Sequence, residues 1–213
     1  MKGINSLISE TSLDRLIEGY RRFRQETWPA ERARYEALAK KGQKPEALVI
    51  ACSDSRVDPQ TVFGAVAGEL FVVRNVAGLV PTYEPDAHYH GTSAALEYAV
   101  RVLKVPKVVV LGHAQCGGVR AMVEGAPLAR DFVEPWMSMA EATLKDAPEH
   151  AGKDEVIDHC EVEVVRLSLA NLMTFPWIAE AVAAGELRLF GYRFDIHTGK
   201  LEKIEPDQVV PVT

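Results

Sequence analysis

The chain has 213 residues, a formal net charge of −6 and an isoelectric point near 5.6, with 47% hydrophobic and 25% charged residues. This length suits one domain with a sizeable core, and the acidic balance argues against a nucleic-acid-binding protein, which would favour a clustered basic face. No stretch is long and apolar enough to span a bilayer, and the first residues lack the apolar segment of a signal peptide. The expected location is therefore the cytoplasm.

The N-terminal part of the chain, residues 11–41, predicts two helices separated at Pro29. Ser12 is the expected N-cap of the first helix, and Gly42 the expected C-cap of the second. The first helix carries apolar side chains at helical spacing, namely Leu13, Leu16, Ile17, Tyr20 and Phe23. One apolar stripe on otherwise charged helices indicates a surface arm, which packs on its own domain or on a partner subunit.

Beyond the arm, short apolar strands alternate with helices. The expected strands are residues 47–51, 70–73, 107–111, 187–196 and 201–204. The expected helices are one that begins at Pro59 with Asp58 as its N-cap, then 92–103, one from 117, 132–144, 156–174 and 177–184. This alternation predicts an α/β fold with a central, mostly parallel sheet flanked by helices, closed by a hairpin that turns at Thr198-Gly199. We expect a single domain over residues 1–213, made of a helical arm (1–42) and an α/β core (43–213).

Two of these strands end in residues with metal-binding chemistry. Cys52 ends the first strand and is followed by Asp54 and Arg56, while the third strand leads into His113 and Cys116. Ligands in parallel sheets gather beyond the carboxyl ends of the strands. We therefore predict that Cys52, His113 and Cys116 converge on one zinc ion and leave its fourth position open, as catalytic zinc requires.

A purely structural reading of these residues is the alternative. A lone His-x-x-Cys pair is weak evidence, because buried cysteine and histidine are common in protein cores. A structural zinc would need a fourth protein ligand. Cys160 is the remaining thiol, and its apolar helical surroundings favour core packing. Surface or loop positions are expected for four histidines, namely His88, His90, His150 and His197.

Asp54 and Arg56 strengthen the catalytic reading. In a nearly extended segment alternate residues share a face, so Cys52, Asp54 and Arg56 would point into the same space. The guanidinium would hold the carboxylate ionised, oriented and able only to accept hydrogen bonds. Such an acceptor can accept a hydrogen bond from a zinc-bound hydroxide and so orient its lone pair. The plain alternative is a salt bridge at the end of a strand.

The motif Cys52-Ser53-Asp54-Ser55-Arg56, with Gly112-His113-x-x-Cys116-Gly117-Gly118, resembles the β-class carbonic anhydrases. Further segments match at 69–75, 95–100, 175–177 and 194–199, so the resemblance covers about residues 12–205. It implies a lyase that reversibly hydrates CO2 to bicarbonate and a proton by attack of zinc-bound hydroxide, with one Zn2+ per subunit. The alternatives are hydrolysis of carbonyl sulfide or carbon disulfide on the same zinc scaffold, and a non-catalytic zinc-binding module.

Within that family the chain is more similar to the plant-like members, whose site stays open because the arginine holds the aspartate away from zinc. In a closed state Asp54 would itself bind the metal. Closed members use a Trp-Arg-Tyr trio for bicarbonate, and here those positions are Val49, Arg74 and Phe194. The resemblance also implies substrate-binding roles for Gln43, Phe71, Val76, Tyr98 and Gly117. Finally, it implies a homodimer or homotetramer whose N-terminal helices pack on the partner subunit, with no nucleic-acid or membrane partner.

Overall fold

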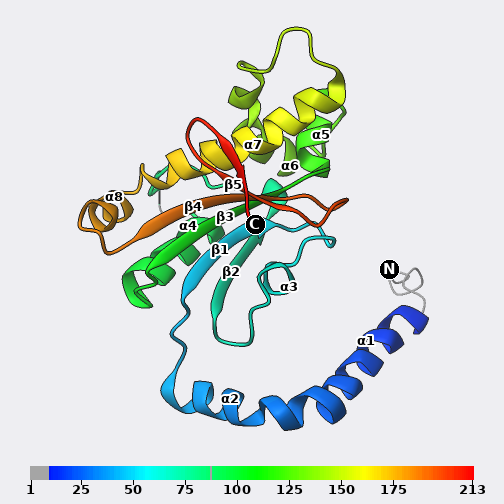
Figure 1. Ribbon diagram of the computed structural model, residues 1–213, viewed down its shortest axis with the longest axis vertical. Helices are drawn as coiled ribbons and strands as arrows, with labels where there is room; N and C mark the ends of the chain where they lie inside the picture. The colour runs from blue at the N-terminus through cyan, green and yellow to red at the C-terminus, as the bar shows by residue number, and fades with distance from the viewer. Residues whose placement is uncertain (1–9, 87) are drawn as a thin grey trace. The chain divides into compact units, whose positions relative to one another are not determined.

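A computed structural model describes residues 10–86 and 88–213 of the chain (Figure 1). The chain divides into two units, Met1–Gln43 and Lys44–Thr213, each of which is described by itself. Among the described residues no helix has both the length and the apolar character needed to cross a membrane.

The first unit is a long helical arm in three segments. The segments are α1 (Glu10–Arg22), a π-helical segment (Phe23–Thr27) and α2 (Trp28–Lys41). The predicted break at Pro29 is wrong, because Pro29 lies in the first turn of α2, where a missing N–H costs little. Instead the helix widens immediately before the proline, where the N–H of Trp28 bonds to the carbonyl of Phe23.

The ends of this arm test the two predicted caps. Ser12 lies inside α1 rather than ahead of it, so the predicted N-cap is wrong. Gly42 is confirmed as the C-cap, since its φ is 78° and its N–H donates to the carbonyl of Leu38 at 2.9 Å. The apolar side chains of α1 that are exposed are Leu13, Leu16, Ile17 and Tyr20.

A six-stranded sheet forms the centre of the second unit, in the order β2-β1-β3-β4-β5-β6 (Figure 1). The strands are β1 (Ala47–Cys52), β2 (Leu70–Asn75), β3 (Lys107–His113), β4 (Arg188–Phe194), β5 (Leu201–Ile204) and β6 (Val209–Pro211). Strands β2, β1, β3 and β4 pair in parallel, while β5 pairs antiparallel with both β4 and β6. This pairing confirms the predicted fold class and the predicted hairpin. The sequence pattern does not predict β6, because three exposed residues ending in a proline show no period.

The helices of this unit follow the expected order. They are α3 (Pro59–Phe63), α4 (Gly91–Glu97), α5 (Gly117–Glu124), α6 (Val133–Ser138), α7 (Lys153–Leu172) and α8 (Pro176–Ala183). Shorter or wider segments are the 3₁₀ turns Val76–Gly78 and Glu141–Leu144 and the π-helical Tyr98–Val102. Asp58 is confirmed as the N-cap of α3, since its Oδ2 accepts from the N–H of Thr61 at 2.9 Å.

The predicted continuous helix over 132–144 is wrong. It is split into α6 and a 3₁₀ turn at Glu141–Leu144. The Ser138 hydroxyl donates to the carbonyl of Pro135 at 2.8 Å, and that of Thr143 donates to Ala140 at 2.7 Å. Such local side-chain bonds compete with the backbone bonds that would continue the helix.

The sheet carries apolar residues on both faces, because successive side chains of a strand point to opposite sides. On one face the strands pack with α4, α7 and α8 in a core that includes Leu48, Ile50, Leu96, Val108, Val110, Val165, Leu172 and Ile178. On the other face Val62 and Phe63 of α3 pack against a smaller core made of Val49, Ala51, Val57, Val109 and Leu111. Helices thus lie on both faces, as predicted, but the α3 face retains a cavity of about 460 Å³.

Helix α7 lies very close to β3 and β4, and glycines make this possible. A Cβ atom at Gly112 would lie 2.6 Å from Cγ2 of Val165, and one at Gly191 would lie 2.7 Å from Cγ1 of the same valine. These distances are shorter than non-bonded carbon atoms adopt, so a side chain at either position would force Val165 of α7 to shift.

We therefore expect Gly191→Ala to lower the free energy of unfolding by about 1–3 kcal/mol, because it overpacks the contact with α7. Urea denaturation of the purified protein measures this. Gly91→Ala is the matched control, since a Cβ atom there meets no atom within 4 Å, and its effect should stay within about 0.5 kcal/mol. Equal stability of the two variants would contradict the close packing.

Candidate metal centre

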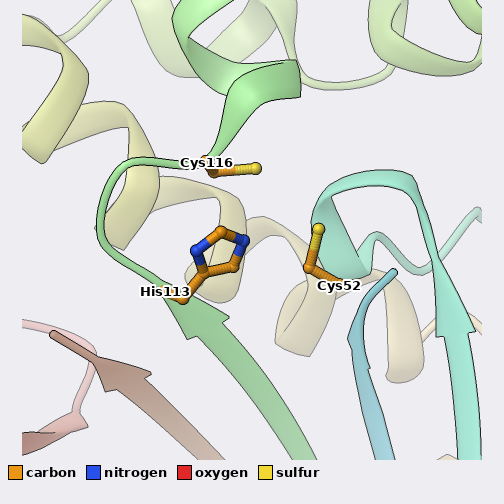
Figure 2. Close-up of side chains that lie close together, drawn as sticks. All are labelled: Cys52, His113 and Cys116. Atoms are coloured by element: carbon orange, nitrogen blue, oxygen red, sulfur yellow. The ribbon is translucent and has the colours of Figure 1, made fainter. Parts of the chain in front are cut away.

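The ends of two neighbouring strands bring the three predicted ligands together. Strands β1 and β3 pair in parallel with Ala51 opposite Leu111, so both strands end at the same edge of the sheet. Cys52 is the last residue of β1 and His113 the last of β3, while Cys116 follows at the N-cap of α5. Figure 2 shows the two sulfur atoms and the imidazole ring pointing into one space. One ligand atom from each residue lies within 4.8 Å of the others, and all three residues are buried.

The imidazole of His113 has one hydrogen-bonded nitrogen and one that is free to bind a metal. Its Nδ1 lies 2.8 Å from the carbonyl oxygen of Ala114, which fixes the tautomer with the proton on Nδ1. Its Nε2 is buried and has no hydrogen-bond partner. An unpartnered buried nitrogen is costly unless a ligand occupies it. Metal-bound histidines commonly carry this second hydrogen bond, so the arrangement fits a metal at Nε2.

The donor set identifies the metal. Two cysteine sulfurs and one imidazole nitrogen suit zinc, and three protein ligands leave one tetrahedral position for a water or substrate. Among the residues that the structure describes, no other group of three His, Cys, Asp or Glu side chains has ligand atoms this close together. The predicted zinc site at Cys52, His113 and Cys116 is confirmed.

The two neighbouring thiols differ in acidity. A hydrogen bond from Cys116 lowers the pKa of Cys52 to about 4, against the opposing effect of burial. The same bond, together with burial, raises the pKa of Cys116. Burial lowers the pKa of His113, but the adjacent Cys52 thiolate, the carbonyl of Ala114 and the Asp54 carboxylate together outweigh burial and leave the pKa raised. Zinc must therefore displace protons from the site, and binding is expected to release them.

Asp54 is held by Arg56 through several hydrogen bonds. Its Oδ1 accepts from the backbone N–H and from Nε of Arg56, both at 2.9 Å, and its Oδ2 accepts from Nη2 at 2.6 Å. Hydrogen bonding to the Arg56 side chain keeps the pKa of the Asp54 carboxyl well below its usual range. The backbone N–H of Asp54 lies 3.4 Å from Sγ of Cys52, which places the pair directly beside the metal ligands.

Two arginines anchor the loops that carry the ligands. Arg56 donates to the carbonyl of Gln115 at 2.9 Å, which joins the loop after β1 to the turn before Cys116. Arg74 donates to three backbone carbonyls at the end of β1 and in the loop that follows it, those of Cys52 (2.9 Å), Asp54 (2.6 Å) and Val57 (2.8 Å). Arg74 therefore holds the loop in shape.

Sequence reasoning misses a further contact to the ligand turn. The side chain of Glu161, on α7, accepts from the backbone N–H of Cys116 at 2.9 Å and is buried. The available signal is an acid on the buried face of a helix whose neighbours on that face, Cys160, Val164 and Val165, are apolar. Cys160 is fully buried, as predicted, in an apolar cluster that also includes Met137 and Val164. His88, His90, His150 and His197 are exposed, also as predicted.

The five residues expected to bind substrate occupy different places. Val76 lines a cavity of about 730 Å³ whose wall also includes Ser53, the residue after Cys52. The rings of Phe71 and Tyr98 contact each other with centroids 5.9 Å apart, and neither lines that cavity.

The other two lie at the ends of segments. Gly117 is the first residue of α5, directly after Cys116, with open space where a Cβ atom would project. Gln43 is exposed and is the last residue of the first unit. Roles in substrate binding stay predictions for all five.

Comparison with known proteins gives consistent results. Residues 47–201 match the family described as carbonic anhydrase. A carbonic anhydrase of Pseudomonas aeruginosa is 40% identical over 193 residues, which cover 89% of this chain and 86% of the relative. The solved structure of the β-carbonic anhydrase CcaA has a TM-score of 0.87 at 30% identity, covering 95% of this chain and 93% of that one. A structure from a study of two tetrameric β-carbonic anhydrases of Sordaria macrospora has a TM-score of 0.78 at 29% identity, covering 92% and 98%.

The site predicts which cysteine the metal needs. Cys52→Ser should reduce the zinc content from about one ion per chain to nearly none, because it removes one of three ligands. Cys160→Ser is the matched control, since Cys160 is equally buried but packs in the core outside the three-residue group, and it should keep its zinc. Elemental analysis of the purified proteins gives the answer. Zinc retained by Cys52→Ser, or lost by Cys160→Ser, would contradict the assigned ligands.

Proposed function

The chain belongs to the β class of the carbonic anhydrase family, and we propose from this premise how its own residues hydrate CO2 to bicarbonate and a proton. The observation that carries the function is the convergence of Cys52, His113 and Cys116 with Nε2 of His113 left unpartnered. Cys52, His113 and Cys116 would hold the zinc, which would lower the pKa of a coordinated water toward neutrality and so supply a nucleophile at physiological pH. In the overall reaction one C–O bond forms to CO2, and the proton that the water loses passes to buffer.

Asp54 is the proposed acceptor for the nucleophile. Its Oδ1 already accepts two hydrogen bonds from Arg56, whereas its Oδ2 accepts only one. A carboxylate oxygen accepts about two hydrogen bonds, so Oδ2 has room for one more. We assign this remaining position to the O–H of the nucleophile. The hydrogen bond holds that proton at Oδ2 and leaves an oxygen lone pair free for the carbon of CO2.

Arg56 gives the site its proposed open, plant-like character. To bind the metal, Asp54 would have to give up its three hydrogen bonds from Arg56. Val49 and Phe194 stand where closed members of the family have Trp and Tyr, and the third position, Arg74, is engaged with backbone carbonyls. These observations favour a resting state in which the aspartate stays off the zinc.

The proposed substrate-side residues are Gln43, Phe71, Val76, Tyr98 and Gly117. Val76 has the most direct support, because it lines the cavity that begins beside the ligand loop at Ser53. The indole N–H of Trp136 donates to the carbonyl of Val76 at 2.8 Å and so fixes this wall. An apolar wall suits CO2, which carries no net charge or dipole.

We also propose that the protein is a homodimer or homotetramer. Each subunit would be a single domain whose N-terminal arm packs on a partner subunit. The exposed apolar side chains of α1 support this, since Leu16 is 70% exposed and Tyr20 58% exposed. The Sordaria relatives are described as tetrameric. The free state of all three cysteines supports a reducing, cytoplasmic location.

The mechanism predicts that Asp54→Ala keeps its zinc but loses turnover by about a hundredfold or more, because the hydrogen bond to the nucleophile is gone. Stopped-flow CO2 hydration measures the rate, and elemental analysis measures the metal. Asp154→Ala is the matched control, since its side chain is 88% exposed and lies on another element, and it should retain full activity. An Asp54→Ala variant as fast as the parent would remove Asp54 from the mechanism. Release of sulfide from carbonyl sulfide without CO2 hydration would favour the hydrolase alternative.

The arm predicts a change in assembly. Leu16→Lys places a charge in the exposed apolar stripe and should shift the protein to a smaller species, measured by light scattering after gel filtration. Gln25→Lys adds the same charge at another exposed position of the arm and should leave the mass unchanged. If both variants have the mass of the parent, α1 does not hold the subunits together.

A further inference from the structure

A buried carboxylate contacts the backbone of a zinc ligand. Glu161 lies on α7, its side chain is 1% exposed, and its Oε1 accepts from the N–H of Cys116 at 2.9 Å. Removing a charged group from water is expensive unless the group is paired and hydrogen-bonded. An apolar residue would fill this position at lower cost, as Val164 and Val165 do beside it. The retained acid therefore calls for a specific role.

Arg193 supplies the paired charge from another element. This arginine lies on β4, opposite Gly112 of β3, and its side chain is 11% exposed. Its Nη2 and Nε both donate to one oxygen of Glu161, Oε2, at 2.7 and 3.2 Å, which leaves Oε1 for the N–H of Cys116. It also donates to Asp158 at 2.6 Å and to Glu202 at 3.2 Å. Burial raises the pKa of Glu161, while the bonds from Arg193 and Cys116 act in the opposite direction.

The turn between His113 and Cys116 needs support because its backbone is unfavourable. Gln115 has a φ of 60°, a left-handed conformation that few residues other than glycine adopt. Three hydrogen bonds hold the turn: Ala114 N–H to the carbonyl of Phe194 (2.9 Å), Arg56 to the carbonyl of Gln115 (2.9 Å), and Cys116 N–H to Glu161 (2.9 Å). The last of these acts on the peptide group of the ligand itself.

We propose that Glu161 and Arg193 are positioning residues of the metal centre. The carboxylate of Glu161 fixes the peptide of Cys116 and so directs its sulfur at the metal, and the two donors of Arg193 on Oε2 keep the carboxylate in place. The inference rests on the zinc ligands and not on the proposed role of Asp54, so its test reads metal binding rather than turnover.

The same helix provides a matched control. Glu163 forms an ion pair with Arg166 three residues on, both side chains are partly buried, and Arg166 also donates to the carbonyl of Glu205 at 2.9 Å. This pair resembles the Glu161–Arg193 pair in chemistry, but its hydrogen bond outside the pair runs to the carbonyl of Glu205 and not to the ligand turn. A loss seen with Glu161 and not with Glu163 therefore belongs to the metal centre and not to the general stability of α7.

The experiment compares Glu161→Ala, Glu161→Gln and Glu163→Gln as purified holoenzymes. Zinc affinity is measured by competition with a chromogenic chelator, and each protein is also loaded with Co2+ so that the thiolate-to-cobalt absorption bands report on the sulfur geometry. Glu161→Ala should weaken zinc binding about 10–100-fold and shift those bands. The zinc affinity of Glu161→Gln should lie between those of the parent and of Glu161→Ala, because its amide oxygen can still accept a hydrogen bond from the N–H of Cys116. Glu163→Gln should match the parent in both measurements.

If Glu161→Ala does not fold, Glu161→Gln and Arg193→Lys decide the question, since Arg193→Lys keeps the charge but cannot reproduce the planar pair of donors to Oε2. Both should then weaken zinc binding and shift the cobalt bands relative to Glu163→Gln. Zinc affinity and cobalt spectra equal to those of Glu163→Gln in the Glu161 and Arg193 variants would overturn the proposal, even if these variants are less stable to heat.

Discussion

Parallel pairing of β1 with β3 is the constraint on which the rest of the molecule depends. Because the two strands run in the same direction and in register, their last residues emerge at one edge of the sheet. Cys52 and His113 thus meet although 61 positions separate them in the sequence, and the short turn after β3 adds Cys116. An antiparallel arrangement would have sent these ends to opposite edges. The apolar cores on both faces of the sheet stabilise this pairing, and so they stabilise the metal site.

Charge at the site is divided between the protein and the metal. The carboxylate of Asp54 is paired with Arg56 inside its own loop, and that of Glu161 is paired with Arg193 across α7 and β4. Each acid therefore has its own guanidinium, and both thiols remain available to the zinc. This separation matters because an unpaired buried charge near the metal would compete with the thiols for it. The pairing with Arg56 also keeps Asp54 ionised beside Cys52.

Local chemistry explains which features could be predicted from the sequence. Apolar runs such as 107–111 mark strands, and Asp58-Pro59 marks a helix start, because their signals lie within a few residues. Cys52 and His113 could be found because strand ends carry them, and Cys116 because it follows His113 by three residues. The predicted helix over 132–144 is split between Ser138 and Glu141, and this split depends on hydroxyl hydrogen bonds that composition does not reveal. The link from Glu161 to Cys116 crosses 45 positions and exists only once α7 lies on the sheet.

The missing side chains at Gly112 and Gly191 have a consequence that reaches beyond packing. They let α7 settle against β3 and β4 at a separation that no larger residue would permit, and a Cβ atom at Gly112 would stand 3.6 Å from the carbonyl oxygen of Glu161 itself. The reach of a glutamate is fixed by its two methylene groups, so the spacing between helix and sheet decides whether its carboxylate arrives at the ligand turn at all. The absence of a side chain at Gly112 and Gly191 thereby helps to set the distance between Glu161 and the turn that carries Cys116, although neither glycine is a metal ligand.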